Sequence, residues 1–236
     1  MYAQAVINPI LKLDPSRMSI SRGLERQTAS SLMAITSLQK KAPGEILFAE
    51  GDEADCVYEI TSGMVRLYKL LPDGRRQITG FLRAGNLLGW APEGVCVYTA
   101  EAITEVTVCR YKRKALERLI DEAPSFAKRL LAVTSHELRA AQDQMVLLGR
   151  KTALEKVASF LMVMAERQDG SDAAEIDVPM TRSDIGDYLG LTLETVSRCL
   201  HKLKQTGLIA LPTSGHVVIK DHDQLEQIAA GEVESD

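Results

Sequence analysis

The sequence predicts an α+β chain with an N-terminal antiparallel β-roll, a long dimerisation helix and a C-terminal winged helix-turn-helix. Three observations predict it: short β-type runs punctuated by glycines from about Lys40 to Arg110, helical periodicity from Arg113 onward, and two short helical segments that flank Gly190. The expected domains are an N-terminal segment 1–37, the roll 38–120, the dimerisation helix and hinge 121–149, and the winged module 150–236.

The composition is that of a globular chain without a membrane segment. Of its 236 residues, 45% are hydrophobic and 25% charged, and no run approaches the roughly 18 apolar residues that a membrane helix needs. The first thirty residues lack the features of a secretory signal, so we expect a cytoplasmic protein. The four cysteines, Cys56, Cys96, Cys109 and Cys199, are too scattered to predict a disulfide framework or a zinc site.

The roll is predicted from four β-type runs and one strong turn signal. The runs are Val57–Ile60, Met64–Tyr68, Ile78–Phe81 and Ala102–Arg110. Pro72-Asp73-Gly74 lies between two of them, and a glycine at the last of these positions is free to take a positive φ. We therefore expect a hairpin at this point.

A long helix with an apolar seam is predicted from Arg113 to about Leu148, with Pro124 in a first turn. Its seam residues recur at alternating spacings of three and four: Leu131, Thr134, Leu138, Ala141, Met145 and Leu148. Such a seam is consistent with packing on its own domain or with a two-helix dimer interface, and the module that follows favours the dimer. Gly149 is expected to interrupt the helix.

Three further features are predicted after Gly149. Thr152 and Glu155 have the spacing of a capping box, which indicates a new helix. The acidic stretch Gln168–Asp177 indicates a surface loop. Ser214-Gly215 indicates the turn of a hairpin wing.

Residues 181–205 have the pattern of a helix-turn-helix. Thr181 suits the N-cap of the first helix, and Ile185 and Leu189 give that helix an apolar face. In the second helix, about 100° per residue places Val196, Leu200 and Leu203 in one buried stripe. The opposite face then consists of Glu194, Ser197, Arg198 and His201.

This opposite face has the chemistry of base recognition in DNA. Arg198 can donate two hydrogen bonds to guanine, Glu194 can accept one from cytosine, and Leu193 can meet a thymine methyl group. The predicted base-reading residues are Leu193, Glu194, Ser197 and Arg198, and the predicted DNA-backbone contacts are Thr181, Arg182, Ser183, Thr192, Thr195, His201 and Lys202. The alternative is that Glu194 and Arg198 form only a surface ion pair.

The charge of the chain is weak counter-evidence for a DNA-binding role. The formal net charge is -4, whereas a nucleic-acid-binding surface is usually basic. From Thr181 to Thr206, however, four lysines and arginines face three acidic residues, a local balance of +1. The acidic total therefore does not exclude DNA binding.

On these residues the chain resembles the cAMP-receptor/FNR superfamily of bacterial regulators, from about Leu38 to Lys220. Glu194-Thr195-Val196-Ser197-Arg198 matches the E-x-x-S-R signature of the FNR and FixK branch, and Gly85-x-x-x-Gly89 is similar to the family's cyclic-nucleotide-binding-like β-roll. The resemblance implies a homodimer that binds a TTGAT-N4-ATCAA-like palindrome in double-stranded DNA. It also implies an activator that works with RNA polymerase on genes of microaerobic respiration, denitrification or nitrogen fixation.

The roll departs from the ligand-binding members of that family. Members that bind cAMP have a glutamate and an Arg-Ser or Arg-Thr pair where this chain has Asn86 and Cys96-Val97. No cysteines group near the N-terminus to hold an iron-sulfur cluster, and no histidine precedes His136 to ligate haem, although a cysteine-ligated haem stays open. We therefore expect a regulator with no cofactor or metal that is active without cAMP, cluster or haem. The alternative is a regulator whose roll senses an unidentified small molecule.

Two remaining questions concern catalysis and Cys199. No nucleophile–base pair, glycine-rich phosphate loop or metal-ligand spacing is visible, so an enzyme is not expected.

Cys199 lies beside Arg198 in the second helix of the helix-turn-helix. The pattern favours a half-buried packing residue, and the alternative is a redox switch in which oxidation adds negative charge near a phosphate.

Overall fold

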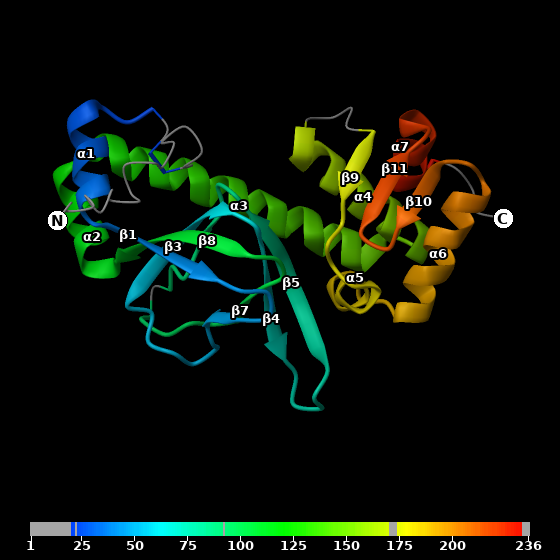
Figure 1. The fold of residues 1–236 in the computed structure, drawn as a ribbon, viewed down its shortest axis with the longest axis horizontal. Helices are drawn as coiled ribbons and strands as arrows, with labels where there is room; N and C mark the ends of the chain where they lie inside the picture. Colours follow the sequence, from blue (N-terminus) through cyan, green and yellow to red (C-terminus); the bar gives the residue numbers. More distant parts are fainter. Residues whose placement is uncertain (1–19, 22, 92, 170–173, 233–236) are drawn as a thin grey trace, which may run out of the picture. The chain divides into compact units, whose positions relative to one another are not determined.

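The computed structural model describes residues 20–21, 23–91, 93–169 and 174–232 (Figure 1). It divides into two compact units, one of residues 1–70 and 79–138 and one of residues 71–78 and 139–236. Much of the predicted N-terminal segment 1–37 lies outside the described residues, and within it α1 spans Arg26–Ala34. The predicted α+β class, with a roll, a long helix and a winged helix-turn-helix, is confirmed.

The roll consists of two antiparallel sheets in the described part of the chain. One has the order β1(Thr36–Lys41)-β8(Val106–Lys112)-β3(Cys56–Ser62)-β6(Leu87–Leu88), and the other has the order β2(Ile46–Phe48)-β7(Thr99–Ala102)-β4(Met64–Leu70)-β5(Arg76–Arg83). Alternating side chains of both sheets point inward, and Ile60, Val65, Ala100 and Val108 are fully buried there. Burial of these side chains holds the two sheets together.

The predicted hairpin at Pro72–Gly74 is confirmed. The Leu71 N–H donates to the Arg75 carbonyl at 2.8 Å, and Gly74 has φ +83°. The run Ala102–Arg110, in contrast, was predicted as one strand, but Ala102 ends β7 and only Val106–Arg110 lies in β8, which belongs to the other sheet. The chain changes sheet between them against Gly63, where a Cβ would lie 2.1 Å from the Glu105 carbonyl oxygen.

The helical segment after the roll consists of two helices in the described residues, and Pro124 lies in the first turn of the second one, as predicted. It forms α2(Arg113–Glu122) and α3(Pro124–Arg150), separated by Ala123 in an extended conformation. The break occurs here because the residue before a proline is disfavoured in helical geometry. In the described part of the chain no helix is long and apolar enough to cross a membrane.

The predicted helix end at Gly149 is also wrong. α3 continues through Gly149 to Arg150, and the next helix, α4(Ala153–Asp169), begins after Thr152. The capping box is confirmed: Thr152 N–H donates to Glu155 Oε2 at 3.1 Å, and Glu155 N–H donates to Thr152 Oγ1 at 3.4 Å. An exposed helical glycine is tolerated, so the cap determines where the helices part.

Within the described residues, the winged module combines four helices with a small sheet. After α4 come α5(Arg182–Leu189), α6(Leu193–Gln205) and α7(His222–Ala230), and the sheet has the order β10(Ile209–Thr213)-β11(His216–Ile219)-β9(Glu175–Asp177). The stretch Gln168–Asp177 was predicted as a loop, but its end is the edge strand β9, with residues 170–173 outside the described range. Ile176 is fully buried between two exposed acids, which explains the pairing with β11.

The turn between α5 and α6 depends on two glycines. Gly190 ends α5 in the left-handed region with φ +64°. The Leu191 N–H donates to the Gly186 carbonyl at 3.0 Å, and a Cβ on Gly186 would lie 2.7 Å from the Leu191 carbonyl oxygen. The chain can therefore fold back against α5 because residue 186 has no side chain.

We predict that Gly186→Ala lowers the free energy of unfolding by about 1–3 kcal/mol, the usual effect of overpacking. The control is Gly149→Ala, also within a helix, where a Cβ meets nothing within 4 Å. That substitution is expected to be neutral or to stabilise by up to about 1 kcal/mol. Urea unfolding of both variants measures the difference, and equal stabilities would contradict the steric account of Gly186.

Candidate nucleic-acid interface

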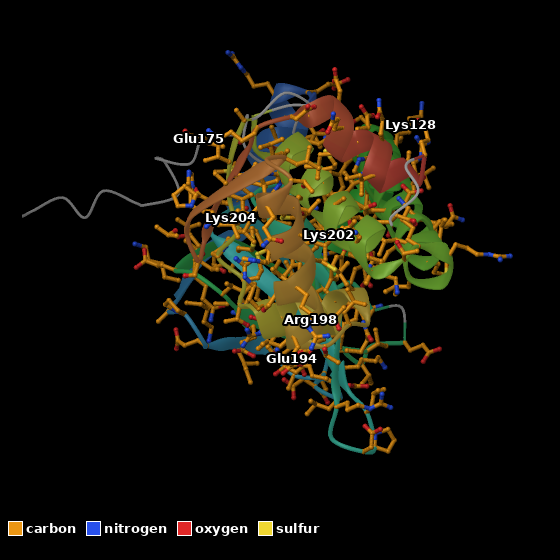
Figure 2. All side chains as sticks on the ribbon, turned by 90° about the vertical axis from the view of Figure 1, so that its right-hand side faces the viewer. Lys128, Glu175, Glu194, Arg198, Lys202 and Lys204 are labelled. Atoms are coloured by element: carbon orange, nitrogen blue, oxygen red, sulfur yellow. The ribbon has the colours of Figure 1, made fainter. Side chains whose placement is uncertain are left out.

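Helix α6 has one buried and one exposed face. Val196, Leu200 and Leu203 are buried, as the periodicity predicted. Figure 2 shows Glu194, Arg198 and Lys202 along one side of α6. Of the predicted DNA contacts, Thr181, Ser183, Thr192, Leu193, Glu194, Ser197, Arg198, His201 and Lys202 are exposed, whereas Arg182 and Thr195 are half-buried.

The first turn of α6 keeps its acidic side chain ionised. The Thr192 hydroxyl caps the helix by accepting from the Thr195 N–H at 3.2 Å. The pKa of Glu194 is lowered by hydrogen bonds from its own backbone N–H and from Thr192, with a smaller contribution from the Arg198 charge. An exposed carboxylate acceptor and an exposed guanidinium donor therefore lie one helical turn apart, a combination able to bind base edges.

The first turn of α5 offers donors suited to phosphate. Thr181 and Asp184 form a capping box, in which the Asp184 N–H donates to Thr181 Oγ1 at 3.1 Å and the Thr181 N–H donates to Asp184 Oδ2 at 3.1 Å. Among the described residues, Arg182 Nη1 is buried and has no hydrogen-bond partner, and burial lowers the Arg182 pKa. A buried cationic donor without a partner is costly, so an anion from outside the chain would stabilise it.

Cys199 lies on the packing side of α6. Its thiol is buried, and burial raises its pKa, an effect that the nearby charge of Lys202 only partly offsets. The thiol is therefore protonated at neutral pH, whereas oxidation proceeds through the thiolate. This environment fits the packing role better than the redox role.

The predicted dimer seam of α3 is exposed along the helix. Leu131, Leu138 and Met145 are 68%, 60% and 64% exposed, at intervals of seven residues. Thr134 and Ala141 are exposed as well, and Leu148 is half-buried. Val146, which the seam pattern did not include, is also exposed. A row of large exposed apolar side chains on a helix is typical of a partner-binding face.

In the roll, Asn86 is held by protein groups through both ends of its amide. Its Nδ2 donates to Glu137 Oε1 on α3 at 2.8 Å, and its Oδ1 accepts from the Arg83 N–H at 3.0 Å. Cys96 is buried, and Val97 is exposed. These three side chains include neither a carboxylate nor a guanidinium.

Two groups that shape the interface were missed from the sequence. Asp184 completes a capping box whose T-x-x-D spacing was visible next to Thr181. Gly186 had no local signal, because its role depends on the approach of Leu191. Among the described residues, no three His, Cys, Asp or Glu side chains are grouped so that they could hold a metal ion.

Comparison with known proteins agrees with the two parts of this architecture. Residues 155–228 match the Crp-like helix-turn-helix domain, and residues 38–123 match the cyclic nucleotide-binding domain. The nitrogen fixation regulation protein FixK of Bradyrhizobium diazoefficiens is 44% identical over 191 residues, which are 79% of each chain. The transcriptional activatory protein AadR of Rhodopseudomonas palustris is 44% identical over 190 residues, 80% of this chain and 79% of the relative.

A solved structure of a relative has the same fold. The structure of FixK2 from Bradyrhizobium japonicum superimposes with a TM-score of 0.78 at 39% identity, covering 86% of this chain and 100% of that one. Both the sequence and the structure thus match regulators over most of their length. The chain belongs to the Crp/Fnr superfamily of DNA-binding transcription regulators, a family of non-enzymatic proteins, and within it to the FixK-like branch.

Proposed function

We propose that the protein is a homodimeric activator that binds a TTGAT-N4-ATCAA-like palindrome without a small-molecule effector. The observation that carries the proposal is the exposed face of α6, where Glu194, Ser197 and Arg198 of the E-x-x-S-R signature lie opposite a buried stripe. A helix of this kind fits the major groove, where its exposed side chains meet base edges.

Each proposed contact follows from the chemistry of its side chain. Arg198 donates to guanine O6 and N7, Glu194 accepts from cytosine N4, and Leu193 packs on a thymine methyl group. Ser197 completes the base-reading set. The phosphates are bound by Thr181, Arg182, Ser183, Thr192, Thr195, His201 and Lys202.

Dimerisation through α3 would match the symmetry of the palindrome. The exposed seam of Leu131, Leu138 and Met145 forms a continuous apolar row suited to a second copy of the helix. In a two-fold dimer the two α6 helices enter successive major grooves about 34 Å apart.

Effector independence is supported by how the roll fills its own interior. Phe48 stacks on Tyr58 with ring centroids 5.7 Å apart and packs on Tyr98 at 6.2 Å. Asn86 is committed to Arg83 and Glu137, as described above. A ligand would have to displace these contacts, and the displaced polar groups would need new partners.

The biological context is proposed from the relatives. FixK is named as a regulator of nitrogen fixation and AadR as a transcriptional activator, at 44% identity each. We propose that this protein activates, with RNA polymerase, genes for nitrogen fixation or microaerobic metabolism.

The proposal predicts tight binding of the purified protein to the palindrome with nothing added. At about 0.15 M salt, the dissociation constant should be at least about 1,000-fold lower for the palindrome than for a scrambled duplex. Fluorescence anisotropy measures both values, and added cAMP should change neither. Selectivity that appears only with cAMP or cell extract would show that the roll senses a ligand.

Substitutions on α6 should separate base contacts from phosphate contacts. Arg198→Ala is expected to cost about 1–3 kcal/mol per half-site and to relax discrimination at the guanine. Lys202→Ala should weaken binding to all duplexes alike. It should also reduce the slope of log affinity against log salt concentration by about one, the effect of losing one phosphate contact. Binding to single-base operator variants checks both, and a uniform loss from Arg198→Ala would assign that residue to phosphate.

The α3 seam should determine the oligomeric state. Leu138→Lys places a charge within the apolar row and should raise the dimer dissociation constant at least about 30-fold, roughly 2 kcal/mol. His136→Lys adds the same side chain at an exposed position about 200° around the helix and serves as the control. Analytical ultracentrifugation measures both. A dimer that is insensitive to Leu138→Lys would exclude this seam.

A further inference from the structure

The tip of the β4–β5 hairpin belongs to the same compact unit as the winged module. From this tip, Arg76 contacts two carboxylates of α5: its Nη2 lies 2.5 Å from Asp184 Oδ1 and 2.7 Å from Asp187 Oδ2, and its Nε donates to Asp187 Oδ2 at 2.9 Å. Gln77 Nε2 donates to the Asp187 carbonyl at 2.7 Å. Two adjacent side chains thus bind a single turn of α5.

Asp184 makes this contact more than a surface ion pair. Its side chain is 3% exposed, and its Oδ2 already accepts from the Thr181 N–H and from the Thr181 hydroxyl at 2.7 Å. A buried carboxylate is costly unless its charge and both oxygens have partners. Arg76 supplies the opposite charge at the other oxygen, so the capping box of α5 is completed by a residue 108 positions earlier in the chain.

The charge balance of α5 changes with this contact. The helix carries one basic residue, Arg182, and two acidic ones, Asp184 and Asp187, so alone it has an excess of negative charge. Burial alone would lower the Arg76 pKa, but Asp187 and Asp184 together raise it, which keeps the guanidinium charged. Charged Arg76 balances the acids beside the residues proposed to bind phosphate.

We propose that Arg76 is a positioning residue for DNA binding: it fixes the phosphate-facing end of α5 and neutralises the two acids there, and through α5 it supports α6. The inference rests on the proposed function, because it assigns the first turn of α5 to the DNA backbone. Ile185 and Leu189 of α5 are buried, and α5 packs against α6, so a shift of one helix would disturb the other.

The test is a double-mutant cycle on DNA affinity, using the full-length protein and the palindromic duplex. Arg76→Gln should weaken binding about ten-fold at low salt and less at high salt, because salt screens the repulsion between the uncovered carboxylates and phosphate. In a background that carries both Asp184→Asn and Asp187→Asn, where neither acid is charged, the same substitution should cost no more than about three-fold. Additive losses would mean that Arg76 acts independently of these two acids and would overturn the proposal.

Arg75→Gln is the matched control. Arg75 lies in the same hairpin, is 76% exposed and pairs with Asp73 rather than with α5. Arg75→Gln should change the DNA affinity by less than about two-fold. A loss equal to that of Arg76→Gln would mean that only the net charge of the hairpin matters, and it would overturn the proposal. If Arg76→Gln does not fold, Arg76→Lys keeps the charge without the two-pronged contact and should give an intermediate loss, whereas wild-type affinity would overturn the proposal.

The DNA affinity of the wild-type protein distinguishes a failure of the proposed function from a failure of the role of Arg76. Failure of the wild type to prefer the palindrome would overturn the proposed function and this inference with it. Selective wild-type binding that Arg76→Gln leaves unchanged would overturn the role of Arg76 alone.

Discussion

The close approach of the Leu191 carbonyl to Gly186 is the constraint on which the proposed DNA interface depends. It lets the chain turn through Gly190 and start α6 at the Thr192 cap, with the stripe of α6 packed inward. Because a helix presents its side chains at fixed angular intervals, burying Val196 and Leu200 fixes the outward direction of Glu194 and Arg198. The direction of the exposed face is therefore a consequence of packing.

The acidic end of α5 is the second element of this arrangement. Asp184 is buried, caps the helix through Thr181 and is paired by Arg76, so local capping and a long-range ion pair meet in one carboxylate. Breaking a buried pair by removing one partner leaves an uncompensated charge, which is more costly than losing an exposed ion pair. Arg182, in contrast, has a buried donor without a partner among the described residues. The same helix end thus combines acids satisfied within the chain with a base available to an external anion.

Features set by local periodicity could be predicted from the sequence. The buried stripe of α6, the exposed row on α3 and the Pro72–Gly74 turn all follow from spacing within a few turns or residues. The wrong predictions concern segments whose structure depends on pairing with residues far away in the sequence. β9 forms because Ile176 pairs with β11, and the run Ala102–Arg110 divides because Ala102 ends β7 in one sheet whereas Val106–Arg110 lies in β8 of the other. Gly149 looked like a helix end, but in an exposed position it costs too little to end one.

The same distinction explains what the sequence shows about ligand binding. Asn86, Cys96 and Val97 show that this chain departs from the residue pattern of cAMP-binding relatives, but the sequence does not show which groups Asn86 contacts. Its partner Glu137 lies 51 residues away on α3, beyond the reach of any local pattern. Once both ends of the amide are bonded within the protein, a ligand gains nothing from Asn86 unless it replaces two existing hydrogen bonds. The structure thus adds to the sequence pattern the two contacts that Asn86 makes within the protein, with Arg83 and with Glu137.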